Sequence, residues 1–196
     1  MEFIAHRINT VQELAALDRH YGAELDLRDD LTGKIYIAHN PFTAGEDFEK
    51  YLANYQHGTM ILNIKSERIE EQALKLLQKY NIKKYFFLDS TFPMIKLLSD
   101  AGERNIALRY SEFEGIDTLQ FMRGKAKWVW ADCFTKFPFT QESYQKIREL
   151  GYKICLVSPE LEGHGEDIAA YKKIMLANNF TVDAICTKAY NIEKWR

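Results

Sequence analysis

Polar side chains that could take part in chemistry are concentrated in the first third of this chain. The candidates are His6, Arg7, Glu24, Asp26, His39, Asn40, Asn63 and Lys65. Each lies within or at the end of a short apolar run, and two pairs of them are separated by a single residue. Because side chains alternate in direction along a strand, the members of such a pair lie on one face.

Two of these groups are suited to binding a metal and a phosphate. Glu24 and Asp26 on one strand face can hold a hard divalent cation, Mg²⁺ or Ca²⁺, through their oxygens. Arg7 and Lys65 carry positive charge that can pair with a phosphate, and the arginine can do so with two parallel hydrogen bonds.

The two histidines of this set suit proton transfer. His6 and His39 on opposite sides of such a site can act as general base and general acid. A metal, cationic side chains and a histidine pair together meet the needs of an in-line displacement at phosphorus. His20, His57 and His164 lack such neighbours, and we interpret them as structural or exposed.

The elements that must position these residues alternate between strand and helix. We expect eight strands, at residues 3–6, 23–27, 59–65, 85–89, 106–110, 127–133, 153–158 and 182–187. An extended arm at 34–39 and a helix at 46–56 interrupt the alternation. We also expect Thr10 to cap the first helix in a capping box with Glu13, and Ser66 to cap an amphipathic helix.

Strands that alternate with helices favour a parallel sheet with right-handed crossovers. Eight such units predict an α/β fold of the compact (β/α)8 TIM barrel type, as one domain over residues 1–196. An open doubly wound sheet is the alternative. In a barrel, the first three strands are neighbours, so the polar residues at their ends would converge on one mouth.

Composition narrows the class of protein. Hydrophobic residues make up 46% of the chain, and 26 basic against 28 acidic side chains leave no basic field for nucleic acid. No apolar run approaches the about 20 residues of a membrane helix, and no signal peptide is evident, so we expect no membrane anchor. Three dispersed cysteines suggest a reducing cytoplasm. The oligomeric state is left open.

The short motifs HR at 6–7, ELD at 24–26, AHN at 38–40 and NIK at 63–65 resemble those of the glycerophosphodiester phosphodiesterases. That family belongs to a wider group of phosphatidylinositol-phospholipase-like phosphodiesterases, all barrels. The similarity is dense over residues 5–65, and beyond them FLDSTF and VDAICT resemble family strands more loosely.

The resemblance implies a role for each of the matching residues. His6 and His39 would be the acid–base pair, Arg7 a phosphate ligand, and Lys65 a cation for the phosphate or the metal side. It also implies a divalent metal, Mg²⁺ or Ca²⁺, at Glu24, Asp26 and Asn63, and a small-molecule phosphodiester substrate with glycerol-like groups.

Three positions depart from the family pattern. Ile8 replaces the glycine after His-Arg, Asn40 replaces an aspartate, and Asn63 replaces the third metal carboxylate. We therefore expect weak metal binding. Two alternatives to hydrolysis remain: a barrel that only binds a phosphorylated ligand, and a lyase that releases a cyclic phosphate.

Later strands offer further candidates. Trp130 would contribute to substrate binding, although core packing explains its alternation with Trp128 and Asp132 equally well. Asp89-Ser90, Arg109 and Thr187-Lys188 follow other strands, and the loop at 158–167 is a candidate lid whose default interpretation is an inert surface loop.

Overall fold

Eight parallel strands form one curled sheet in the computed structural model, which describes residues 1–196. They are β1 (Glu2–Ala5), β2 (Gly22–Asp29), β5 (Met60–Ile64), β6 (Tyr85–Leu88), β7 (Ala107–Tyr110), β8 (Trp128–Ala131), β9 (Lys153–Val157) and β10 (Ala184–Thr187). Their order is β6-β5-β2-β1-β10-β9-β8-β7, so the first and last strands of the chain pair at the middle of the sheet. All eight expected strands are confirmed, with small shifts at their ends.

The two edges of this curled sheet meet at one point. A single parallel bridge joins Phe87 of β6 to Ile106, and the Phe87 backbone N–H donates to the Asn105 carbonyl at 2.9 Å. The other neighbouring parallel strands are joined by ladders of two or more registered pairs. The sheet therefore has a seam between β6 and β7.

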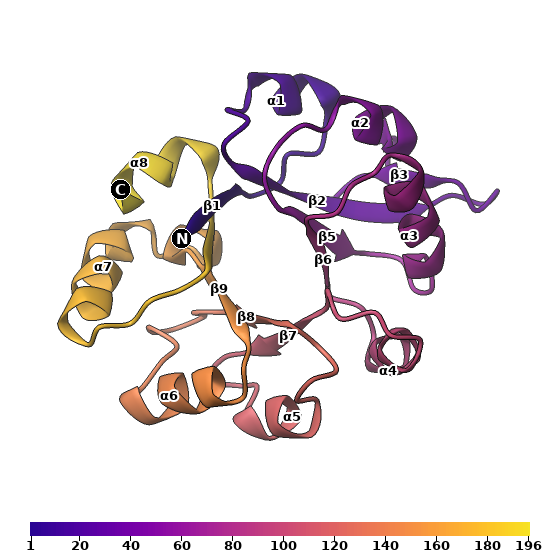
Figure 1. Ribbon diagram of the computed structural model, residues 1–196. Coiled ribbons are helices and arrows are strands. Elements are labelled where there is room, and N and C mark those ends of the chain that lie inside the picture. Colours follow the sequence, from indigo (N-terminus) through magenta and orange to yellow (C-terminus); the bar gives the residue numbers. More distant parts are fainter.

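Helices cover the outside of the ring of strands (Figure 1). They are α1 (Val11–Ala16), α2 (Phe48–Asn54), α3 (Glu70–Lys79), α4 (Phe92–Asp100), α5 (Ile116–Phe121), α6 (Gln141–Glu149), α7 (Ile168–Ala177) and α8 (Ile192–Trp195). Short 3-10 helices lie at Pro159–Glu162, Gly165–Asp167 and Ala189–Asn191, the first two within the candidate lid. The strands are nearly all buried because helices cover one face and strand side chains fill the interior, as parallel sheets require. No helix combines the length and apolar character that crossing a bilayer requires.

The arm after β2 folds back as an antiparallel strand. β3 (Ile35–Ile37) pairs with β2, and β4 (Glu46–Asp47) pairs with β3. The expected helix at 46–56 was thus partly wrong: its first two residues form β4, and α2 begins at Phe48 with the Asp47 side chain accepting from the Lys50 N–H. The arm carries His39 back to the mouth formed by the strand ends.

The two expected helix caps have different outcomes. The capping box of Thr10 and Glu13 is confirmed at α1. The cap at Ser66 was wrong, because α3 begins at Glu70 and its N-cap residue, Ile69, makes no side-chain cap bond. The Ser66 hydroxyl instead accepts a hydrogen bond from the Asp29 N–H at 3.3 Å and joins the end of β2 to the loop after β5.

Candidate functional site

The carboxyl ends of the strands surround a cleft of about 470 Å³. The predicted residues that line it are His6, Arg7, Asp26, His39, Asn63, Lys65 and Trp130. The remaining predicted residue, Glu24, lies beneath the cleft and is fully buried, hydrogen-bonded to Asn63. The structure therefore brings together all eight site residues predicted from the sequence.

The position of His39 is fixed from both sides of its ring. Its Nδ1 lies 3.3 Å from Asp26 Oδ1, and its Nε2 lies 2.7 Å from Arg7 Nη2. A guanidinium only donates, so Nε2 must accept and the neutral ring carries its proton on Nδ1, toward the carboxylate. The Arg28 guanidinium holds the backbone of this arm by donating to the His39 carbonyl at 2.8 Å. His39 is thus oriented as a base, with Nε2 unprotonated.

His6 has different hydrogen-bond partners from His39 and therefore a different tautomer. Lys188 Nζ lies 3.0 Å from its Nδ1, and its Nε2 lies 3.7 Å from Glu24 Oε2. Burial, followed by the positive charges of Lys188 and Arg7, lowers the pKa of His6 to about 3. An ammonium donates to Nδ1, so neutral His6 carries its proton on Nε2. The two histidines therefore have opposite tautomers.

The two predicted metal carboxylates already have protein partners. Glu24 accepts hydrogen bonds from the Arg7 backbone N–H at 2.7 Å and from Asn63 Nδ2 at 2.9 Å. Asp26 accepts from Asn9 Nδ2 at 2.9 Å and lies 3.8 Å from Arg7 Nε and 3.7 Å from Lys65 Nζ. Burial and the nearby Asp26 charge raise the pKa of Glu24 to about 7. A cation at this point would favour the ionised form of Glu24.

The same groups fit a weak cation site better than a strong one. No group of three or more His, Cys, Asp or Glu side chains is placed to hold a metal ion. However, Asn63 Oδ1 is buried and has no hydrogen-bond partner, beside the Glu24 carboxylate. A buried amide oxygen without a partner is costly, and a hard cation is one group that would satisfy it. The donor set of two carboxylates and one amide oxygen fits Mg²⁺ or Ca²⁺ with low affinity.

The far half of the cleft contains a connected ion-pair network. Arg109 Nε donates to Asp89 Oδ1 at 2.8 Å, and Arg109 Nη1 pairs with Asp132 Oδ2. Trp130 Nε1 donates to Asp132 Oδ1 at 2.8 Å, and Lys65 Nζ lies 3.4 Å from Asp89 Oδ2. Burial raises the pKa of Asp132 to about 7 although Arg109 opposes this. Trp130 thus lines the cleft as predicted, and its indole N–H holds Asp132.

Two of these cleft residues have unusual backbone conformations. Arg7 has φ 56° and Asp89 has φ 60°, both in the left-handed region that residues with a side chain seldom adopt. Asp89 directly follows β6, and Arg7 is the second residue after the end of β1. Backbone strain of this kind persists where the surrounding structure enforces it, often at functional sites. Here it turns the Arg7 guanidinium toward His39 and the Asp89 carboxylate toward Lys65 and Arg109.

Sequence reasoning underestimated Lys188. It missed Asn9, which donates to Asp26, and it missed Glu114 and Glu162, which line the cleft. Lys188 follows β10, so its proximity to His6 depends on the pairing of the first strand with the last. Glu160 fixes Lys188 from the 158–167 loop by accepting its backbone N–H at 3.0 Å and the Thr187 hydroxyl. That contact gives the candidate lid a structural role. A charged residue directly after a strand was the available signal for Lys188.

Comparisons with known proteins agree with this geometry at the level of fold. No protein-family model and no curated protein matches the chain. Among solved structures, a glycerophosphodiester phosphodiesterase from Agrobacterium tumefaciens superposes with a TM-score of 0.67 at 15% identity, over 96% of this chain and 97% of that one. A second protein from that organism, assigned as a glycerophosphoryl diester phosphodiesterase, gives 0.69 at 12% identity, over 99% and 97%.

This chain has the glycerophosphodiester phosphodiesterase fold. The structural similarity covers nearly the whole chain. The cleft of this chain lies at the carboxyl ends of the strands, the usual position of active sites in α/β barrels. Fold alone does not assign an activity, which must be argued from the side chains in the cleft.

Proposed function

We propose that this chain is a phosphoric diester hydrolase that acts on a glycerophosphodiester-like substrate. The observation that carries the proposal is the placement of His6 and His39, with opposite tautomers, in one cleft with Arg7 and Lys65. The solved structures that share the fold include a glycerophosphodiester phosphodiesterase, which supports the same reaction. We also infer that the sheet closes as a (β/α)8 barrel through the Phe87–Ile106 bridge.

The cationic side chains bind the phosphate in this proposal. Arg7 and Lys65 line the cleft, and each lies within 4 Å of the Asp26 carboxylate. An anionic diester would take over part of that pairing, with Arg7 able to form two parallel hydrogen bonds to it. When Arg7 turns to the phosphate, it releases His39 Nε2, to which it is bound at 2.7 Å.

His39 is the general base. Its free Nε2 takes a proton from the attacking water as the water oxygen bonds to phosphorus, and Asp26 stabilises the imidazolium through Nδ1. His6 is on the acid side, because its Nε2 carries a proton in the neutral ring. That proton passes to the leaving alcohol oxygen while Lys188 supplies one to Nδ1, so the charge on the imidazole is conserved.

Glu24, Asp26 and Asn63 would hold a divalent cation, Mg²⁺ or Ca²⁺, in this proposal. When bound, such an ion supplies charge stabilisation at the phosphoryl oxygens. Asn63 contributes its unpartnered Oδ1, and its neutral amide leaves the site with less negative charge than a third carboxylate would. Low metal affinity is therefore part of the proposal.

The test is a panel of glycerophosphodiesters incubated with the chain, in chelator or with added Mg²⁺ or Ca²⁺, and followed by phosphorus NMR. Hydrolysis yields a phosphomonoester and an alcohol, whereas a lyase would yield a cyclic phosphate. His39→Gln should lower kcat/KM by at least about 10² with the circular dichroism unchanged. The exposed His20, mutated to Gln, is the control and should keep full activity. If the chain binds diesters but cleaves none of them, the hydrolase proposal is refuted, and the alternative of a barrel that only binds a phosphorylated ligand remains.

A further inference from the structure

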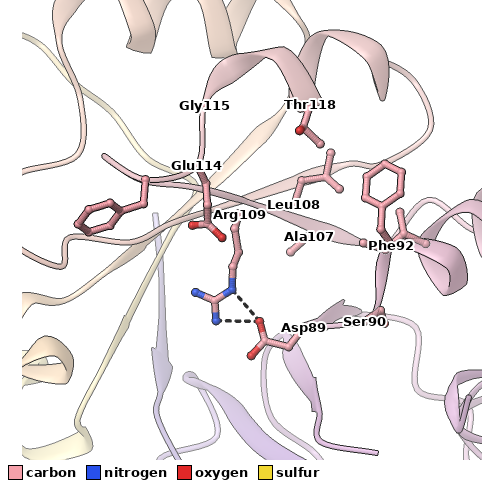
Figure 2. A pocket seen from close by; sticks show the side chains of 11 residues that line it. Asp89, Ser90, Phe92, Ala107, Leu108, Arg109, Glu114, Gly115 and Thr118 are labelled. Atoms are coloured by element: carbon pink, nitrogen blue, oxygen red, sulfur yellow. Dashed lines mark hydrogen bonds and ion pairs between the residues drawn. The ribbon is translucent and has the colours of Figure 1, made fainter. Parts of the chain in front are cut away.

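A cavity of about 330 Å³ lies at the amino ends of the strands, opposite the cleft. Every residue that lines this floor cavity begins a parallel strand or lies one or two positions before one. The same strands end at the cleft, where Asp89 after β6 and Arg109 of β7 form an ion pair (Figure 2). The reaction proposed for the cleft uses none of the residues of the floor cavity, so their arrangement needs a separate explanation.

Four of the residues that line the floor cavity are lysines. Lys83 and Lys84 precede β6, Lys127 precedes β8, and Lys153 begins β9. All four are exposed, and none of them forms an ion pair with a carboxylate, whereas surface lysines such as Lys79 do. Unpaired like charges around one cavity repel one another, so an anion placed between them is attracted by all four.

The two carboxylates of the lining are bound to other groups. Glu2 accepts hydrogen bonds from the Thr59 N–H and from the Thr59 hydroxyl, the latter at 2.7 Å. Asp183 accepts from Arg148 Nη1 at 2.7 Å and from the Ile154 N–H at 2.9 Å. Four positive charges minus two negative charges leave the lining with a net charge of +2. The acids therefore do not neutralise the lysines.

Backbone hydrogen bonds fix the points from which these lysines extend. The Lys84 carbonyl accepts from the Met60 N–H at 2.9 Å, and the Lys127 carbonyl accepts from the Lys153 N–H at 2.9 Å. Lys153 Nζ lies 5.2 Å from the centre of the Trp128 ring, in a cation–π contact. The charges are thus carried by the edge of the sheet, and binding an anion requires only that the flexible ends of the lysines turn inward.

The walls restrict the class of anion. Trp128 is only 6% exposed and its ring stacks on Phe86 at 4.7 Å, so it offers no free face to a nucleobase. The Tyr85 hydroxyl already donates to Glu103 at 2.6 Å. Lysine binds phosphate as a point charge, and the volume is at the low end of the about 300–1,000 Å³ of small-molecule sites. Recognition in this cavity therefore depends on charge concentrated in a small ligand.

We propose that the floor cavity binds a compact, multiply charged phosphate anion, of the pyrophosphate class, between its four lysines. The proposal does not depend on the hydrolase activity, because the floor cavity and the cleft share no residue. It also differs from the phosphate contact proposed for Arg7 and Lys65, which lie at the other end of the strands.

Two tryptophans distinguish the two anion sites in the first experiment. Trp128 lines the floor cavity and Trp130 lines the cleft, so their indole N–H signals report on the two sites separately. Pyrophosphate is titrated into the isotope-labelled whole chain in metal-free buffer at constant ionic strength, balanced with chloride, and followed by proton–nitrogen NMR. We expect the Trp128 signal to shift and to saturate. A shift of Trp130 alone would overturn the proposal and leave phosphate binding in the cleft.

Matched variants test whether the lysines bind the anion. Lys84→Gln/Lys127→Gln removes two of the four charges and keeps Lys153 over the Trp128 ring. Lys75→Gln/Lys173→Gln removes the same charge from exposed positions on α3 and α7, outside the floor cavity. We expect the Kd from the Trp128 signal to rise at least about tenfold in the first variant and to stay near the wild-type value in the second. Equal affinities in the two variants would overturn the proposal, since net charge alone would then explain the attraction.

Urea unfolding of the same three proteins gives a second measurement. A ligand stabilises the folded state that binds it, so pyrophosphate should raise the urea midpoint of the wild type and the control variant more than that of Lys84→Gln/Lys127→Gln. Phosphate salts also stabilise folded proteins in general by exclusion from their surface. An equal rise in all three proteins would mean that pyrophosphate acts only in this general way, and the site would be refuted.

Discussion

Replacement of His6 by glutamine should remove much of the acid sensitivity of the fold. The pKa of His6 is lowered from 6.5 to about 3, chiefly by burial. Below pH 6.5 the unfolded chain takes up a proton at this histidine, whereas the folded chain does so only near pH 3. The stability that neutral His6 contributes is therefore complete above pH 6.5 and is lost as the pH falls toward 3.

The magnitude follows from the two pKa values. Each pKa unit corresponds to about 1.4 kcal/mol, so a pH drop from 7 to 4 costs about 3 kcal/mol of unfolding free energy through this group alone. Buried carboxylates such as Glu24, whose pKa is raised, change stability in the opposite direction. Their contribution is common to wild type and variant, so the difference between the two proteins isolates His6.

The assay is urea unfolding at pH 7 and pH 4, in chelator, for the wild type, His6→Gln and His20→Gln. We expect the difference in unfolding free energy between the two pH values to shift by about 3 kcal/mol in His6→Gln. The exposed His20 should behave as wild type when replaced. An unchanged difference in His6→Gln would show that this ring titrates normally, and the assignment of its neutral tautomer would fail with it.

Three further outcomes test other parts of the structure. Asn63→Glu should bind Mg²⁺ or Ca²⁺ several-fold more tightly by calorimetry, because a third carboxylate adds ligand charge; unchanged affinity would mean that residue 63 does not face the ion. Arg109→Gln should lower the unfolding free energy by about 3 kcal/mol at pH 8, because it leaves the buried Asp132 carboxylate with Trp130 as its one partner. The loss should be smaller at pH 5, since the pKa of Asp132 is raised to about 7 and its protonation removes the buried charge. An equal loss at both pH values would contradict this account. Thr10→Ala should cost about 1 kcal/mol in urea unfolding through loss of the α1 cap, and no change would mean that the capping box is unimportant in solution.

The sequence predicted those features that depend on interactions between residues close together in the chain. The alternation of Glu24 with Asp26 and of Asn63 with Lys65 predicted that each pair shares one strand face, because strand geometry repeats every two residues. Asp26, Asn63 and Lys65 line the cleft, and Glu24 lies beneath it, bonded to Asn63. The capping box at Thr10 was predictable for the same reason, since both partners lie within three residues. Such features need no knowledge of the rest of the chain.

Contacts between distant segments could not be predicted in this way. Lys188 meets His6 only because β10 pairs with β1, which depends on the whole sheet. The Ser66 cap failed because its hydroxyl is bonded to the Asp29 N–H of a neighbouring strand, a competitor that no local pattern reveals. The seam beside Phe87 has no counterpart in local periodicity either, since β6 and β7 each look like ordinary strands.

The seam also means that the edges of the sheet, β6 and β7, are formed by the middle of the chain and not by its first and last strands. β1 and β10 are joined by four registered pairs from Glu2 to Ala5, so the first and last strands of the chain lie together on a continuous stretch of sheet. The break in pairing falls instead near Asn105, in the middle of the chain. A circular permutant that begins near Asn105, with residue 196 linked to residue 1, would cut no ladder between neighbouring strands. It would run from one edge of the sheet to the other in nearly the order in which the strands lie side by side.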